Sequence, residues 1–229
     1  MHSAMGGFSS SSEHPSPEEV MRMMRRLSAP ENEAPVTVPA NMVLARGPHA
    51  AVLLTFVLAY STGTELGVSI RVWPRTGRRT KPLHQLIAGM GPDEPDVNRE
   101  FLLGVQYADG RRTMTSGWRR MPTPAVEDGE QALSLVQGMS GGSDNTYDLR
   151  FWLSPLPPPG PVTVVCRFPE FGIDETQVVL DGTAIAAAGR DAVELWPVQI
   201  PDEPVPEPPA LLLPDGGWFA GQDQRATGD

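Results

Sequence analysis

The sequence has little of the chemistry that catalytic and metal sites depend on. Its 229 residues include one cysteine, Cys166, and four histidines that are far apart (His2, His14, His49 and His84). A lone cysteine cannot form an intramolecular disulfide, which fits a reducing compartment. The histidines lack the close spacing of metal ligands. We therefore expect no metal and no cofactor, and we also find no glycine loop of the phosphate-binding types.

Long apolar runs are also missing. The longest, residues 50–60, is too short to cross a bilayer as a helix. The first 20 residues are polar and rich in serine, and they contain no apolar stretch that could act as a signal peptide. The sequence thus predicts a soluble, cytoplasmic protein without a membrane span.

Basic charge is scarce and uneven. The formal net charge is -10. Residues 1–120 contain 14 basic and 11 acidic residues, whereas residues 121–229 contain 4 basic and 17 acidic residues. A net-acidic chain is repelled by phosphate backbones, so nucleic acid is not the expected partner. An arginine cluster around Arg75, Arg78 and Arg79 could be solvated, contact an acidic partner or lie against the acidic C-terminal segment.

Proline and glycine are abundant, with 25 and 23 residues, and they divide the chain. Residues 1–16 have the low complexity of a disordered tail, and residues 200–229 are dominated by proline and acidic side chains. We expect one folded domain over residues 17–199 between these tails. The C-terminal tail carries apolar islands that could contact a partner, at Leu212 and at Trp218 and Phe219.

Short alternating apolar runs fill the domain. They predict eight or nine strands joined mostly as hairpins, one of them turning at Asp109 and Gly110, and another around a glycine-rich loop at residues 138–145. A proline stretch, residues 155–161, predicts a rigid extended link between strands. This pattern indicates a mainly β fold, an antiparallel β-sandwich with two short peripheral helices and disordered termini.

The first helix is expected at residues 17–28, where an apolar stripe repeats at helical spacing (Val20, Met23, Met24 and Leu27). This stripe could pack on the domain or dock on another chain. The second helix is expected at residues 182–196, capped by Asp181 and stopped by Pro197. Residues 83–87 could add a short helical turn.

Strand alternation assigns faces near the C-terminal half of the domain. Cys166 alternates inward with Val164 and Phe168, so it is expected in the core rather than at a reactive site. Trp152 alternates with Phe151 and Leu153, so it is expected on an exposed face, where it could contact a partner.

One motif suggests nucleophilic catalysis. Residues 138–142 read G-M-S-G-G, which matches the G-x-S-x-G elbow around Ser140. The elbow needs a helix after the serine and a histidine later in the chain, and neither is expected here. Asp144, Asn145 and Asp148 could hold calcium weakly, but they lack the pattern of an EF-hand loop, so a turn is favoured.

The block from residue 152, W-L-S-P-L-P-P-P-G-P-V-T, continued by F-P-E-F-G-I from residue 168, resembles a block of an uncharacterised bacterial protein family from GC-rich genomes. It covers roughly the third quarter of the chain. The resemblance implies a shared fold and carries no activity and no site residues.

The sequence favours a non-catalytic protein-binding or assembly module whose partner is another protein. Two alternatives stay open: a hydrolase with a site assembled from Ser140, Asp144, His84 and His49, and a phage-like structural subunit. The residues we expect to contact a partner are dispersed over loop, strand and tail (Arg75, Arg78, Arg79, Trp152, Leu212, Trp218 and Phe219).

Overall fold

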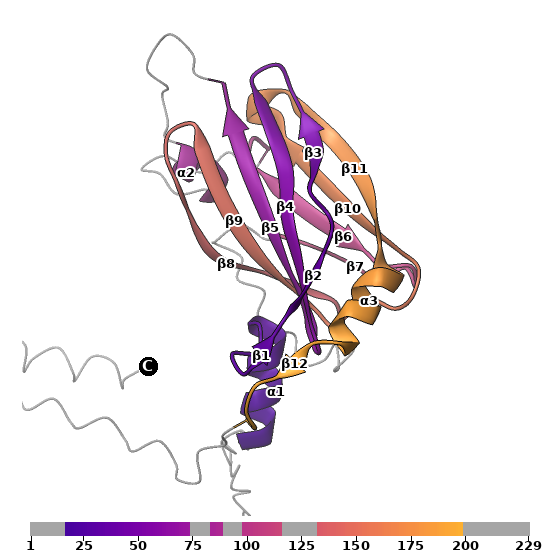
Figure 1. The fold of residues 1–229 in the computed structure, drawn as a ribbon. Coiled ribbons are helices and arrows are strands. Elements are labelled where there is room, and N and C mark those ends of the chain that lie inside the picture. Colours follow the sequence, from indigo (N-terminus) through magenta and orange to yellow (C-terminus); the bar gives the residue numbers. More distant parts are fainter. Residues whose placement is uncertain (1–16, 74–82, 89–97, 116–131, 199–229) are drawn as a thin grey trace, which may run out of the picture. The chain divides into compact units, whose positions relative to one another are not determined.

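A computed structural model describes residues 17–73, 83–88, 98–115 and 132–198 of the chain. They belong to one compact unit that ends at Val198. The fold is mainly β and all strand pairs are antiparallel, as the alternating runs predicted. Most strands belong to two sheets, which face each other as in a sandwich (Figure 1).

The larger sheet has six strands in the order β2-β4-β5-β9-β8, with β3 also paired to β4. Both short strands share one edge of β4, because β2 pairs with its second half and β3 with its first. Pro39 lies between them, where its missing amide costs no ladder bond. The strands are β2 (Val36–Val38), β3 (Met42–Arg46), β4 (Ala50–Tyr60), β5 (Gly63–Val72), β8 (Ser134–Gly142) and β9 (Thr146–Ser154).

The smaller sheet has four strands in the order β11-β10-β6-β7. Its β6–β7 hairpin turns at Asp109 and Gly110, as predicted, and Gly110 takes the positive φ of 87° that suits glycine. The strands are β6 (Leu102–Gln106), β7 (Arg112–Met114), β10 (Pro161–Phe168) and β11 (Ile173–Asp181).

The proline stretch connects the two sheets, from the end of β9 to the start of β10. Two hydrogen bonds hold it to the domain. The Tyr107 hydroxyl donates to the Pro155 carbonyl at 2.6 Å, and the Gly160 amide donates to Thr183 Oγ1 at 2.9 Å. The predicted link between strands is confirmed.

The core lies between the sheets and consists of the inward halves of the alternating strands. In β10, Val162, Val164, Cys166 and Phe168 are all buried, as predicted. They face the buried side chains of the other sheet, among them Leu54, Ile70 and Phe151. The 3₁₀ turn η2 (Pro169–Phe171) adds Phe171, whose ring meets that of Phe168 edge-on at 4.8 Å.

Helix α3 (Gly182–Arg190) begins as predicted but is shorter than predicted. The Asp181 carboxylate accepts from the amides of Thr183 and Ala184 at 2.9 and 3.1 Å. The expected end at residue 196 is wrong. After the last turn of the helix, β12 (Val193–Glu194) pairs with β1 (Glu33–Ala34), and this strand pairing replaces further helical turns.

Two other helices complete the described structure. Helix α1 (Pro17–Leu27) matches the predicted first helix to within one residue. The short α2 (Leu83–Ala88) forms where a helical turn was predicted, and buried Leu83 and Ile87 anchor it to the core. The described part of the chain therefore has three α-helices rather than two.

The glycine-rich loop predicted at residues 138–145 is mostly strand. β8 continues to Gly142, and only residues 143–145 form the turn to β9. A bulge between Gln137 and Ser140 lets the strand absorb extra residues and continue its pairing with β9. Glycine content alone could not distinguish this bulged strand from a loop.

Candidate interaction surface

Helix α1 is fixed to the domain through its backbone. The indole Nε1 of Trp152 donates to the Arg25 carbonyl at 3.0 Å, and the Ser154 hydroxyl donates to the Arg26 carbonyl at 3.3 Å. These carbonyls are at the end of the helix, where backbone acceptors have no partner within it. Side chains of β9 thus supply partners for the last turn of α1.

Trp152 is therefore not the exposed contact residue that alternation predicted. It does lie on the face opposite Phe151 and Leu153, but it is buried, with 4% of its surface exposed. Its ring also meets the ring of Tyr60 edge-on, with centroids 5.6 Å apart. The prediction was wrong because helix α1 and Tyr60 cover this part of the outer sheet face, and alternation within one strand cannot reveal that cover.

Part of the apolar stripe of α1 stays exposed after this attachment. Met23 and Met24 remain largely exposed, at 45% and 54%, and Leu27 is half-buried. The Met24 carbonyl accepts from both the amide and the hydroxyl of Ser28, which closes the helix end. Of the three methionines that the structure describes in this helix, Met23 and Met24 face solvent and Met21 is half-buried.

A second exposed apolar group belongs to the segment that follows α3. Val193, Leu195 and Trp196 are each more than half exposed. Asn32 holds this segment with two hydrogen bonds. Its backbone carbonyl accepts from the Leu195 amide at 2.8 Å, and its side-chain amide donates to the Trp196 carbonyl at 2.9 Å.

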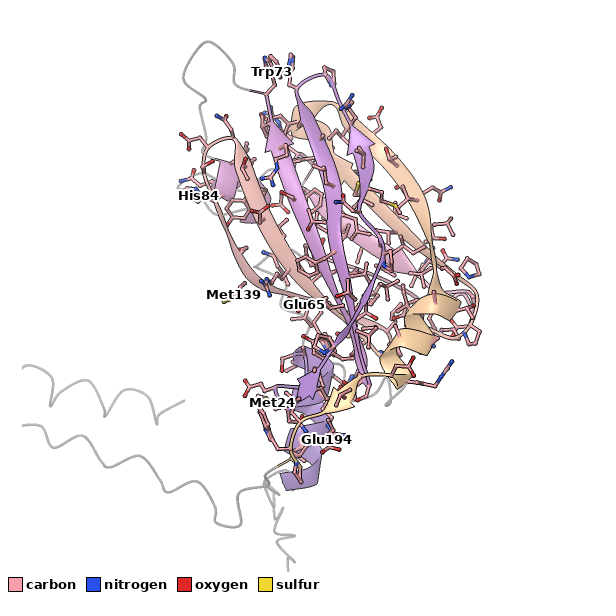
Figure 2. The ribbon with its side chains drawn as sticks, in the orientation of Figure 1. Met24, Glu65, Trp73, His84, Met139 and Glu194 are labelled. Carbon is pink, nitrogen blue, oxygen red and sulfur yellow. The ribbon has the colours of Figure 1, made fainter. Side chains whose placement is uncertain are left out.

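These two groups lie at one end of the domain. Asn32 is five residues after the end of α1, so its hydrogen bond to Trp196 connects the α1 end of the chain to the segment after α3. Figure 2 shows Met24 and Glu194 at this end and Trp73 at the opposite end. We call the five side chains Met23, Met24, Val193, Leu195 and Trp196 the helix–exit surface. Half of the ten exposed large apolar side chains of the described residues belong to it.

Comparison with protein-family models, with curated proteins and with solved structures finds no match for this chain. Of the helices in the described ranges, none is both long and apolar enough to span a membrane.

The outer face of the six-stranded sheet carries a second group of side chains. The Arg150 guanidinium lies over the Phe56 ring and pairs with Glu65 at 3.1 Å. The Phe56 ring in turn covers Gly67. The ring and the ion pair thus cover the middle of this face along β5.

Further along the same face, Asp148 accepts from the Ser69 hydroxyl and pairs with Arg71 at 3.5 Å. These contacts use the carboxylate that the sequence suggested as a weak calcium ligand. No group of three or more His, Cys, Asp or Glu side chains in the described ranges is placed to hold a metal ion. The contacts of Asp148 with Ser69 and Arg71 on the neighbouring strand give it a role in stabilising the sheet.

Ser140 does not have the geometry of a nucleophile elbow. It lies in bulged strand β8, with no helix after it, and its hydroxyl is 3.3 Å from the Tyr147 hydroxyl. Within the described residues it makes no hydrogen bond to His49 or His84. Among the described residues, the hydrogen-bond partner of this hydroxyl is another hydroxyl, which is not a general base.

Cys166 is a core residue, as predicted. It is 1% exposed in the middle of β10, and burial raises the pKa of its thiol to about 11. A thiol with this pKa stays protonated at neutral pH and is a poor nucleophile.

The remaining predicted contact residues lie outside the described ranges: Arg75, Arg78, Arg79, Leu212, Trp218 and Phe219. The residues that sequence reasoning missed are Val193, Leu195 and Trp196. They fell within the helix predicted at residues 182–196. The hydrogen bonds from Asn32, 164 residues before Trp196, leave no local signal in the sequence.

Proposed function

We propose that this protein is a non-catalytic binding or assembly module that docks another protein on its helix–exit surface. The observation that carries the proposal is the exposure of five large apolar side chains, each 45–57% exposed, at one end of the domain. Single exposed apolar residues are ordinary, whereas apolar groups gathered on one surface mark interaction sites.

The residue types support protein binding. Tryptophan and methionine are enriched at protein interfaces, where tryptophan supplies a large rigid surface and methionine adapts its shape. Each apolar side chain that a partner covers contributes roughly 25 cal/mol per Å² of surface removed from water.

The attachment of α1 supports the same role. Trp152 and Ser154 bind backbone acceptors of the helix, so Met23 and Met24 can be covered by a partner without breaking these two contacts. The side-chain amide of Asn32 likewise holds Trp196 through its backbone carbonyl, and Trp196 stays more than half exposed.

Site-specific photo-crosslinking of the full chain tests this function. A photoreactive phenylalanine analogue replaces Met24 or Trp196, and Met139 serves as control because it is 79% exposed on β8, away from the surface (Figure 2). After irradiation in a lysate of the cells that make the protein, we expect protein adducts at positions 24 and 196 and none at 139. Adducts at neither position, or equal adducts at 139, would refute the function.

A further inference from the structure

We infer that the free edge of β11 is a second docking site, which binds an extended segment of another protein as an additional strand of the smaller sheet. β11 is the outermost strand of this sheet (Figure 1), and among the described strands it pairs with β10 alone. An edge strand presents backbone amides and carbonyls with which a further strand can pair. The site is separate from the helix–exit surface and does not depend on the proposed function.

β11 carries the longest regular stretch among the edges of the two sheets. Its residues 176–181 pair with β10 without a break, and the register shift of this strand pair falls at Asp174 and Glu175. Residues 176–180, T-Q-V-V-L, contain no charge and no proline. Five residues of strand extend about 17 Å, which is a usual length for a paired strand.

The other described edges are interrupted. β8 has the bulge between Gln137 and Ser140, and β7 has only three residues. The edge beside β4 is divided between the short strands β2 and β3, with Pro39 between them. Bulges, short strands and proline are features that keep edge strands from pairing with other chains. Residues 176–180 of β11 have none of them.

The side chains of this stretch are accessible to a partner. Thr176, Gln177 and Val179 are exposed, and Val179 has 62% of its surface exposed. The turn between β3 and β4 packs on the start of β11, where Gly47 lies against the Ile173 side chain. An added strand would give Val179 a cross-strand neighbour, and pairs of β-branched side chains stabilise sheets.

Charges at the two ends of the stretch favour one kind of partner. β11 has three acidic residues and no basic one, because Asp174 and Glu175 precede the stretch and Asp181 follows it. Glu175 and Asp181 are six positions apart, which is about 20 Å along a strand. A partner strand with a basic residue at each end of a similar length would place opposite charges beside both ends.

The same charges disfavour a second copy of this chain as the partner. Antiparallel pairing of residues 176–180 of two copies places Glu175 of each copy opposite Asp181 of the other. Parallel pairing in register places each carboxylate beside its equivalent. Like charges directly opposite each other destabilise a strand pair. The partner is therefore an uncharged, strand-forming segment of a different protein, flanked by basic residues.

A synthetic peptide, Lys-Thr-Val-Thr-Val-Thr-Lys, tests the site on the full chain. NMR amide shifts locate the bound peptide, and the anisotropy of a fluorescent form gives its dissociation constant. We expect the amide signals of residues 176–180 to shift and their hydrogen exchange to slow. The same peptide with glutamate at both ends should bind about tenfold more weakly, because its ends meet like charges.

Backbone N-methylation of the peptide distinguishes strand addition from binding through side chains. A peptide N-methylated at its five central residues keeps every side chain and both charges but loses the main-chain donors of those residues. Main-chain hydrogen bonds supply the affinity in strand addition. We therefore expect the N-methylated peptide to bind at least about tenfold more weakly.

Variants of the protein test the edge itself. Val179→Lys should weaken peptide binding about tenfold, because lysine on an edge strand opposes pairing and repels the basic peptide. Val43→Lys is the matched control, since Val43 is 49% exposed on β3 of the other sheet and its replacement should leave binding unchanged. Asp181→Asn, which can still cap α3, should weaken binding about two- to fivefold. Circular dichroism of each variant establishes that the fold is retained.

Four outcomes would overturn the inference. They are no binding at millimolar peptide, equal binding of the N-methylated peptide, equal losses in Val179→Lys and Val43→Lys, and a dimer of the free chain that Val179→Lys dissociates. The last would mean that a second copy occupies the edge. Crosslinking at positions 24 and 196 reports on the helix–exit surface independently, so either proposal can fail without the other.

Discussion

The indole of Trp152 donates a 3.0 Å hydrogen bond to the backbone carbonyl of Arg25, 127 residues earlier in the chain. It joins the end of strand β9 to the last turn of the N-terminal helix. Trp152 is at once a buried part of the outer sheet face and a side-chain cap for α1. Together with Ser154, it ties the last turn of α1 to the sheet.

Trp152→Phe should loosen α1. Phenylalanine keeps much of the ring but cannot donate to the Arg25 carbonyl, so we expect a loss of about 1–2 kcal/mol in the free energy of unfolding. Urea unfolding measures this loss, and faster tryptic cleavage at Arg25 and Arg26 reports the freed helix. Trp73→Phe is the control, because Trp73 is 72% exposed and should change the stability by less than about 0.5 kcal/mol. Equal losses in both variants would contradict the role of Trp152.

Gly67→Ala should destabilise the sheet through Phe56. A Cβ at position 67 would meet three atoms of the Phe56 ring at 2.2–2.6 Å, so the ring must move away from the sheet and from Arg150. We expect a loss of about 1–3 kcal/mol by chemical denaturation. Gly141→Ala, also in a strand, has nothing within 4 Å of its added Cβ and should be neutral or slightly stabilising.

A double variant identifies the ring as the cause. In a Phe56→Ala background the added methyl at position 67 meets no ring, so Gly67→Ala should cost much less than it does in the wild type. An unchanged cost would mean that the backbone at position 67, rather than contact with Phe56, limits the residue.

Asp181→Ala should weaken α3. The variant removes the acceptor for the Thr183 and Ala184 amides, and we expect a loss of about 0.5–2 kcal/mol in thermal or urea unfolding. Asp181→Asn should retain most of the stability, because asparagine also caps helices. Asp191→Ala, at the other end of the helix, should be neutral or slightly stabilising because an acidic residue there opposes the macrodipole.

Alkaline pH should destabilise the domain partly through Cys166. Its folded-state pKa of about 11 lies above the usual value of 9.0, so the folded state holds the thiol proton more tightly than the unfolded state does. The resulting stability is fully present below about pH 9 and is lost as the pH rises toward about 11. Burial also raises the pKa of Tyr107 and acts in the same direction.

Unfolding measured from pH 8 to pH 11 checks this contribution. The stability of Cys166→Ala should fall less steeply with pH than that of the wild type, whatever the difference between them at pH 8. Identical slopes would show that the thiol does not contribute. A thiol reagent at pH 8 should label Cys166 only after the protein is unfolded.

The fold could be predicted from the sequence where its signals are local. Alternation in β10 identified the buried face that includes Cys166, and the Asp109-Gly110 pair marked the β6–β7 turn. The Asp181 cap placed the start of α3. Each of these features depends on residues close together in the chain.

The candidate surface depends on distant pairs, and the sequence alone could not predict it. The end of α3 depends on pairing with Glu33 and Ala34, and the burial of Trp152 depends on α1 and Tyr60. For this reason the sequence predicted that residues 193–196 continue the helix and that Trp152 is exposed. Met23 and Met24 were correctly placed on one stripe, but whether that stripe is buried or exposed is a tertiary property.

The β1–β12 pair sets Glu33 directly opposite Glu194. The polypeptide thus enters and leaves the sandwich at neighbouring points, although 160 residues separate them along the chain. The sandwich could therefore be inserted as a unit into a surface loop of an unrelated carrier protein. It could also be circularly permuted by joining these two points and opening the turn at residues 143–145, which leaves the strand ladders of both sheets intact.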